Sequence, residues 1–92
     1  MFIVIFGRDS CHFCVRAKEL AEQLKQQNNQ INYRYVDIIK EGISKADLEK
    51  SVGQPVETVP QIFIDEQPIG GFTEFKAHVD EAPELKALLN GA

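Results

Sequence analysis

Residues 2–14 read FIVIFGRDSCHFC and place the chain's only two cysteines just after a run of apolar residues. The run Phe2–Phe6 is typical of a central strand that is covered on both faces. A short polar turn leads from it into a helix. We expect Ser10 to be the N-cap of that helix, because its hydroxyl can accept from free N–H groups of the first turn. Cys11 is then the first helical residue, and Cys14 lies one turn further on roughly the same face.

The two cysteines are expected to differ in reactivity. Residues three positions apart in a helix have Cβ atoms about 5–6 Å apart, close enough for a disulfide after modest adjustment. Cys11 meets the unpaired N–H groups and the positive end of the helix dipole, which stabilise a thiolate. Cys14 lies deeper, faces inward and stays protonated until Cys11 carries a partner. We therefore predict that Cys11 is the nucleophile and Cys14 the resolving thiol.

Two other interpretations of the cysteine pair stay open at this point. The cysteines could be inert small hydrophobic residues, or they could form half of a zinc site. A zinc site needs further ligands, and the chain offers only His12 and His78 and no second cysteine pair. A C-x-x-C motif beside a strand–helix–strand pattern is typical of thioredoxin-like redox proteins, and this is the interpretation we favour.

Length and charge narrow the class of protein. A chain of 92 residues predicts one domain, residues 1–92, with a single modest core. The net charge of −4 and the lack of a basic stripe argue against a nucleic-acid partner. No stretch approaches the ~20 apolar residues of a membrane span, and the opening run lacks the basic flank of a signal peptide. We expect a cytoplasmic, reducing compartment, where a C-x-x-C pair is catalytic rather than structural.

Periodicity predicts the first half of the fold. Apolar residues at helical spacing predict a helix over 11–27, and residues 31–38 follow as a β-rich strand. Strand, helix and strand then form a unit with parallel strands. The side chains of Tyr33, Tyr35 and Asp37 are expected to serve packing and the turn rather than catalysis.

The second half predicts a helix, a hairpin and two more helices. Ser44 and Asp47 resemble a capping box, and Gly53 ends the helix that they begin. Residues 61–64 and 67–69 form a hairpin around Asp65-Glu66. A third helix runs from near Thr73 to before Pro83, and a short last helix has Leu85, Leu88 and Leu89 on one face.

This order predicts an α/β fold of the thioredoxin type. A parallel strand–helix–strand unit joined to an antiparallel hairpin gives a four-stranded mixed sheet, and we expect helices on both of its faces. The order of elements is strand, helix, strand, helix, strand, strand, helix, with a short extra C-terminal helix. The cysteines lie at the carboxyl end of the first strand, where α/β sheets place their chemistry.

Three motifs, in order and at matching spacing, resemble the glutaredoxins over nearly the whole chain. They are Cys11-His12-Phe13-Cys14 after the first strand, Thr58-Val59-Pro60, and Gly70-Gly71-Phe72-Thr73-Glu74. The chain is most similar to the short, single-domain, dithiol bacterial type. The Gly-Gly segment and the lack of tryptophan before Cys11 favour glutaredoxin over thioredoxin.

The resemblance implies a glutathione-dependent thiol–disulfide oxidoreductase. Cys11 would attack protein disulfides or glutathione mixed disulfides, and Cys14 or a second glutathione would resolve the adduct. The implied partners are glutathione, as co-substrate, and disulfide-containing proteins such as ribonucleotide reductase, to which the protein would donate electrons. We expect a monomer, with no nucleic-acid or membrane partner.

The resemblance also implies a glutathione site. Pro60 would be cis and turn the Thr58-Val59 backbone towards Cys11, so that a peptide pairs with the main chain of Val59. The γ-glutamyl carboxylate would lie over the third helix's N-terminus, and an arginine would hold the glycyl carboxylate. Each residue also has a plain alternative role, as a cap, a hairpin exit or a surface charge. The implied set is Arg8, Phe13, Thr58, Val59, Pro60, Gly71, Phe72, Thr73 and Glu74.

Two residues depart from the family's usual Cys-Pro-Tyr-Cys. His12 replaces the proline and would favour the Cys11 thiolate if protonated, or would be a solvated side chain without a catalytic role. Phe13 keeps an aromatic wall but lacks a hydroxyl. Some glutaredoxins without that proline hold a 2Fe–2S cluster between two protomers, with glutathione as co-ligand. A cluster on Cys11 is therefore an alternative, though not our expected default, and a domain served by thioredoxin reductase is another.

Overall fold

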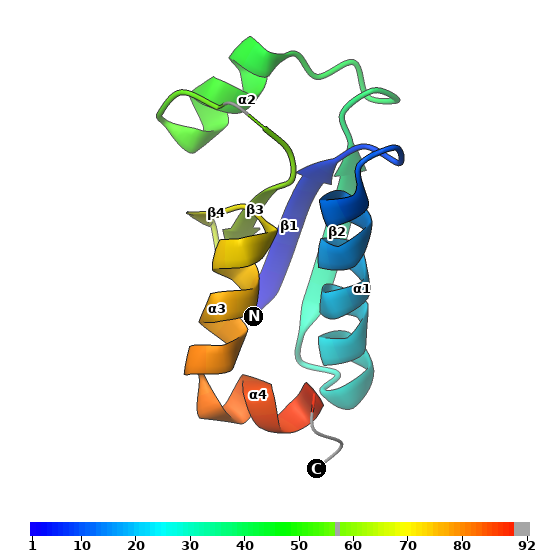
Figure 1. Cartoon of the computed structure of the whole chain (residues 1–92), viewed down its shortest axis with the longest axis vertical. Helices are drawn as coiled ribbons and strands as arrows, with labels where there is room; N and C mark the ends of the chain where they lie inside the picture. The colour runs from blue at the N-terminus through cyan, green and yellow to red at the C-terminus, as the bar shows by residue number, and fades with distance from the viewer. Residues whose placement is uncertain (57, 90–92) are drawn as a thin grey trace.

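The computed structural model describes residues 1–56 and 58–89, and it contains one mixed sheet. Its strands are β1 (Phe2–Gly7), β2 (Asn32–Asp37), β3 (Gln61–Ile64) and β4 (Gln67–Gly70). They lie in the spatial order β2-β1-β3-β4 (Figure 1). Strand β1 is parallel to β2 and antiparallel to β3, and β4 is antiparallel to β3. The predicted four-stranded mixed sheet is confirmed.

The helices follow the predicted order along the chain. They are α1 (His12–Gln27), α2 (Lys45–Val52), α3 (Phe72–Glu81) and α4 (Pro83–Leu89). Figure 1 shows α1, α3 and α4 on one face of the sheet, with α2 beyond the carboxyl end of β1. None of the helices in the described ranges combines the length and apolar character that a bilayer span needs.

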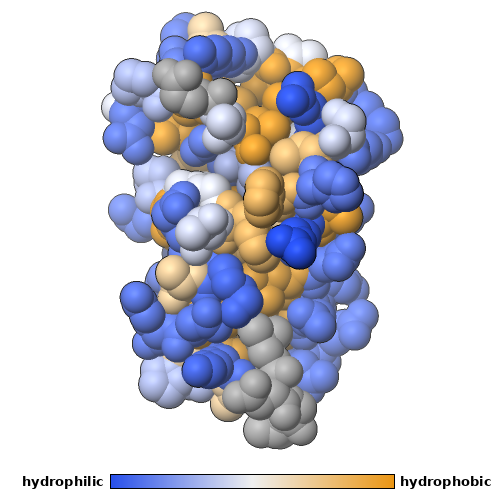
Figure 2. All heavy atoms as spheres, viewed as in Figure 1, coloured by the Kyte–Doolittle hydropathy of each residue, from blue (hydrophilic) through white to orange (hydrophobic). Residues whose placement is uncertain are grey.

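The core lies between the sheet and the helices on that face. Ile3 and Ile5 of β1 are fully buried, because alternate residues of a strand point to the same side. Residues spaced by three or four on α1 meet them, and Leu85 of α4 closes the far end of the core. Figure 2 shows apolar surface gathered in the middle of this side of the molecule, with polar surface on either flank. The buried α1 residues are Cys14, Ala17, Leu20, Ala21 and Leu24.

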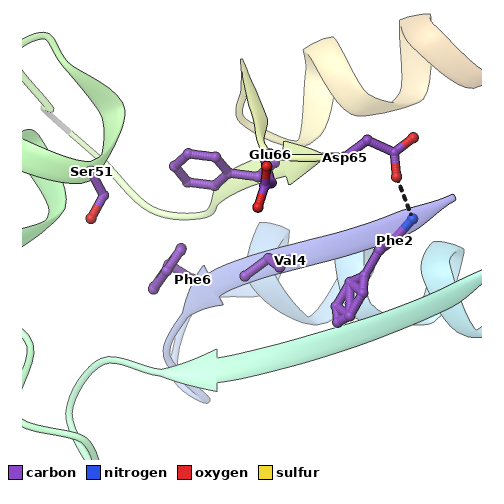
Figure 3. A pocket seen from close by; sticks show the side chains of 7 residues that line it. Phe2, Val4, Phe6, Ser51, Asp65 and Glu66 are labelled. Carbon is purple, nitrogen blue, oxygen red and sulfur yellow. Dashed lines mark hydrogen bonds between the residues drawn. The ribbon is translucent and has the colours of Figure 1, made fainter.

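The second face of the sheet is covered only in part, so the expected cover on both faces is confirmed for one face and incomplete on the other. Phe2 remains 43% exposed, and Val4 and Phe6 are half-buried. A hollow of about 760 Å³ lies over them, and Ser51 of α2 borders it (Figure 3). Helix α2 has eight residues and one buried side chain, Leu48, so its apolar face is too small to cover this side.

Local signals in the second half of the chain are confirmed. Ser44 and Asp47 form the predicted capping box, and Gly53 ends α2 in the left-handed conformation with φ 84°. The hairpin turns at Asp65 and Glu66, which both have positive φ, as a two-residue hairpin turn of this type requires. Helix α3 begins one residue earlier than predicted. The side chain of Leu89 lies outside what the structure describes.

Candidate active site

The sulfur of Cys11 caps helix α1. Cys11 has extended backbone angles, φ −97° and ψ 115°, and its Sγ accepts from the N–H of Cys14 at 3.2 Å. The prediction that Ser10 is the N-cap and Cys11 the first helical residue is therefore wrong. The N–H of Cys11 donates to the carbonyl of Arg8 at 3.1 Å, which closes a turn that contains Ser10. Cys11, directly after this turn, is therefore the residue that precedes the first turn of α1. The reactive atom itself thus satisfies one of the free N–H groups of α1.

The same sulfur contacts the segment before β3. The Cys11 thiol donates to the carbonyl oxygen of Val59 at 3.5 Å. The Val59–Pro60 peptide bond is cis, as the resemblance implied. This bond turns the Val59 backbone towards Cys11, although the two residues are far apart in the sequence. Cys11 is half-buried, whereas Cys14 is fully buried, and both are free thiols.

Cys14 lies in a tight space above Gly7, the last residue of β1. A Cβ atom on Gly7 would lie 2.8 Å from the Cβ and Sγ of Cys14, and also 2.8 Å from the hydroxyl of Tyr35. Distances this short do not occur between real side chains. Only glycine at position 7 lets Cys14 and Tyr35 approach the end of β1 together.

Burial raises the pKa of the Cys14 thiol to about 12. Desolvation is the largest cause, followed by the hydrogen bond with the Cys11 side chain, and the negative charge of an ionised Cys11 adds to both. The backbone and the charge of Arg8 act in the opposite direction. Cys14 is therefore a protonated thiol at neutral pH, as predicted.

A hollow of about 300 Å³ lies beside the capped end of α1. The stacked rings of Phe13 and Phe72 form one wall, with centroids 6.1 Å apart and planes inclined by 29°. Val59, whose carbonyl accepts from Cys11, is among the lining residues and connects the hollow to the sulfur. The full lining is Phe13, Thr58, Val59, Pro60, Gly71, Phe72, Thr73 and Glu74. The structure thus brings together all but one of the residues that the resemblance implied for glutathione.

The N-terminus of α3 forms another part of this hollow. Gly71 is the N-cap, and its N–H donates to Glu74 Oε1 at 2.7 Å. Gly70 has φ 106°, and a Cβ there would lie 2.7 Å from Glu74 Oε1. Gly70 therefore lets the backbone pass close to the Glu74 carboxylate, which leaves a carboxylate and free N–H groups side by side.

Arg8 is the predicted site residue that does not line the hollow. It lies in the turn after β1, exposed, and its charge acts on Cys14. His12 is also exposed, at the first turn of α1. Among the described residues, no group of three or more His, Cys, Asp or Glu side chains is arranged to hold a metal ion.

A mixed sheet whose first strand leads into a helix that begins with a C-x-x-C pair, next to a cis-proline, defines a thioredoxin-like dithiol protein. The family model for glutaredoxin matches residues 3–69. A glutaredoxin from Vibrio cholerae is 68% identical over 81 residues, which cover 88% of this chain and 93% of that protein. The solved structure of reduced Escherichia coli glutaredoxin is 56% identical, with a TM-score of 0.83 over 91% of this chain and 99% of its own.

A more distant structure is also similar. It is a buckwheat glutaredoxin–glutathione complex, 29% identical, with a TM-score of 0.65 over 97% of this chain and 76% of that chain. Together with the family model and the Vibrio cholerae relative, these matches show that the chain belongs to the glutaredoxin family. It is a thiol–disulfide oxidoreductase.

Sequence reasoning missed Gly7 and Tyr35. Gly7 directly follows the predicted strand, and a glycine between a strand and a C-x-x-C motif signals a close approach of the backbone to another group. The sequence predicts only a packing role for Tyr35. Its nearness to Cys14 depends on the register of β2 against β1, which no local pattern reveals.

We predict that Gly7→Ala lowers the free energy of unfolding by about 1–3 kcal/mol, because the added methyl overpacks the space that Cys14 and Tyr35 share. Urea denaturation of reduced protein measures this. Gly42→Ala serves as a comparison, because its Cβ would meet nothing within 4 Å and any loss of stability there comes from its positive φ alone. A Gly7→Ala protein as stable as wild type, with unchanged Cys14 reactivity, would contradict the geometry.

The raised pKa of Cys14 predicts slow alkylation. Moving the pKa from 9.0 to about 12 lowers the thiolate fraction at neutral pH about 1000-fold. In a Cys11→Ser variant, where burial remains, iodoacetamide should alkylate Cys14 at least about 100-fold more slowly in the native state than in urea. The native rate should rise about tenfold per pH unit between pH 7 and 9, because the thiolate fraction does so below the pKa. Equal native and unfolded rates would show that Cys14 is not held as a thiol.

Proposed function

We propose that this protein is a glutathione-dependent reductase of disulfides and mixed disulfides. The observation that carries the proposal is the hollow lined by Phe13, Thr58–Pro60 and Gly71–Glu74, which meets the Cys11 sulfur at Val59. Its volume of about 300 Å³ lies at the lower end of the range for small-molecule sites, which suits a tripeptide bound in part on an open surface. The similar buckwheat protein was solved as a glutathione complex, which also supports this ligand.

The main chain of Val59 would hold the middle of the glutathione molecule. The Val59 backbone lies beside the capped end of α1, and its carbonyl accepts from the Cys11 thiol. An extended peptide that pairs with this backbone, as an added strand does, presents its cysteine towards Cys11. The aromatic wall of Phe13 and Phe72 then limits how the peptide can move sideways.

The γ-glutamyl end of glutathione carries a carboxylate and an ammonium group. The N-terminus of α3, at Thr73, supplies N–H groups and a positive dipole for the carboxylate. Glu74 supplies a carboxylate that can accept from the ammonium group. Arg8 lies outside the hollow, in the turn that precedes Cys11. We propose that its positive charge attracts the glycyl carboxylate by long-range electrostatics, without a direct contact inside the hollow.

The chemistry follows from the contrast between the two cysteines. The Cys11 thiolate attacks the disulfide sulfur, a Cys11 mixed disulfide forms, and the other sulfur leaves as a thiolate that takes up a proton. For a glutathione adduct, a second glutathione thiolate attacks the glutathione sulfur, so oxidised glutathione leaves and Cys11 is regenerated. For a protein disulfide, Cys14 attacks Cys11, and the Cys11–Cys14 disulfide is later reduced by two glutathione molecules.

The finer parts of this assignment rest on the resemblance. We propose that the substrates include protein disulfides such as that of ribonucleotide reductase, that the protein acts as a monomer, and that it works in the cytoplasm. The whole chain would act as a single domain. A 2Fe–2S cluster held on Cys11 between two protomers is the alternative to this assignment and not our default expectation.

Glutathione-coupled turnover of a small glutathione mixed disulfide tests the proposal. Cys11→Ser should lose essentially all activity, because the nucleophile is gone. Cys14→Ser should keep activity within about threefold of wild type, because a second glutathione can resolve the adduct without it. Wild-type protein that shows no glutathione-dependent turnover would refute the proposed function. Activity that is lost in Cys14→Ser and kept in Cys11→Ser would reverse the two roles.

A further inference from the structure

Tyr35 is a half-buried residue with a buried hydroxyl oxygen, and it has no assigned role in the reaction. It lies on β2 opposite Ile5 of β1, and Lys18 Nζ of α1 lies 5.1 Å from the centroid of its ring. Its hydroxyl oxygen is buried and has no hydrogen-bond partner within the described residues. Buried hydroxyls without a partner are uncommon in folded proteins, so this one needs a physical explanation.

The neighbour of this hydroxyl is the thiol of Cys14. The Cys14 Sγ and the Tyr35 hydroxyl oxygen both lie 2.8 Å from the position that a Gly7 Cβ would occupy. The two groups therefore share the small space at the end of β1. A thiol is a weak acceptor, whereas a thiolate is a strong one.

We propose that Tyr35 is a positioning residue for the resolving step, in which its hydroxyl donates a hydrogen bond to the Cys14 sulfur as that sulfur becomes a thiolate. In this step the Cys14 sulfur attacks Cys11 in its mixed disulfide. The Cys11–Cys14 bond forms, and the bond from Cys11 to the leaving sulfur breaks. The proton that Cys14 loses goes to solvent, or to the leaving thiolate where that thiolate is basic enough to take it up, while Tyr35 keeps its own proton throughout.

The surroundings keep Tyr35 in the form that can donate. Burial, followed by the negative charges of Cys14, Asp9 and Asp37, raises the pKa of Tyr35 to about 12. The hydroxyl therefore stays protonated at neutral pH. Burial is also the main reason that the Cys14 thiolate is disfavoured. A single charge-assisted hydrogen bond to this buried thiolate therefore stabilises it strongly.

Tyr33 provides a matched control on the same strand. It lies two residues earlier on the same face of β2, opposite Ile3, and Lys25 Nζ of α1 lies 5.8 Å from the centroid of its ring. Its hydroxyl faces Glu22, which raises the pKa of Tyr33, and not the cysteines. Tyr33→Phe and Tyr35→Phe thus remove the same group from equivalent positions, and each keeps its ring under a lysine.

Stopped-flow reaction with dithiobis(nitrobenzoate) separates the two steps. The reduced protein releases one coloured thiolate when Cys11 attacks and a second one when Cys14 resolves the mixed disulfide. Cys14→Ser should lose the second phase, which assigns that phase. We expect Tyr35→Phe to slow the second phase about tenfold, the effect of losing a hydrogen bond to a charged group, and to leave the first phase within about twofold. Tyr33→Phe should change neither phase.

Stability distinguishes this role from a structural one. Tyr35→Phe removes a hydroxyl that has no partner, so urea denaturation should show an unchanged or higher midpoint. A second phase at the wild-type rate in Tyr35→Phe would overturn the proposal, and so would equal slowing of both phases. The inference rests on the dithiol step of the proposed function, but the reporter contains no glutathione. If the protein does not depend on glutathione, the glutathione-coupled turnover assay shows it, whereas the two phases of the stopped-flow reaction are unaffected.

Discussion

The structure of this site depends on the position of one sulfur atom. Cys11 Sγ accepts from the N–H of Cys14 and donates to the carbonyl of Val59. The first contact ties the sulfur to the positive end of α1, and the second ties it to the segment that carries the cis-proline. The nucleophile is therefore part of the helix cap. The positive end of the α1 dipole interacts favourably with a negative charge on this sulfur.

This arrangement separates the properties of two chemically identical side chains. Cys11 lies at the helix end, half-buried, next to the hollow lined by Phe13 and Phe72. Cys14 lies one turn further, fully buried, where desolvation raises its pKa. The first sulfur can meet a substrate in solution, whereas the second can react only with a partner already bound to the first. Gly7 makes the separation possible because any side chain there would displace Cys14.

Local patterns in the sequence predicted most of the fold and most of the hollow's lining. The spacing of Ala17, Leu20 and Leu24 and the capping box at Ser44 are properties of short segments, and they were interpreted correctly. The sequence predicts Ser10 as the N-cap because hydroxyls are usual caps, but the turn closed by the Arg8 carbonyl places the Cys11 sulfur at the cap instead. Where α2 lies against the sheet, and which groups meet Cys14, depends on tertiary packing that periodicity does not encode.

The most direct test of the central claim, that Cys11 Sγ is the N-cap of α1, is urea denaturation of three reduced variants. Cys11→Ser retains an acceptor at the cap, so its free energy of unfolding should equal or exceed that of wild type. Cys11→Ala removes the acceptor and should lose about 1 kcal/mol, whereas Ser10→Ala should change the stability by less than about 0.5 kcal/mol. Equal stabilities for Cys11→Ser and Cys11→Ala, with the loss appearing in Ser10→Ala, would contradict the account and restore Ser10 as the cap.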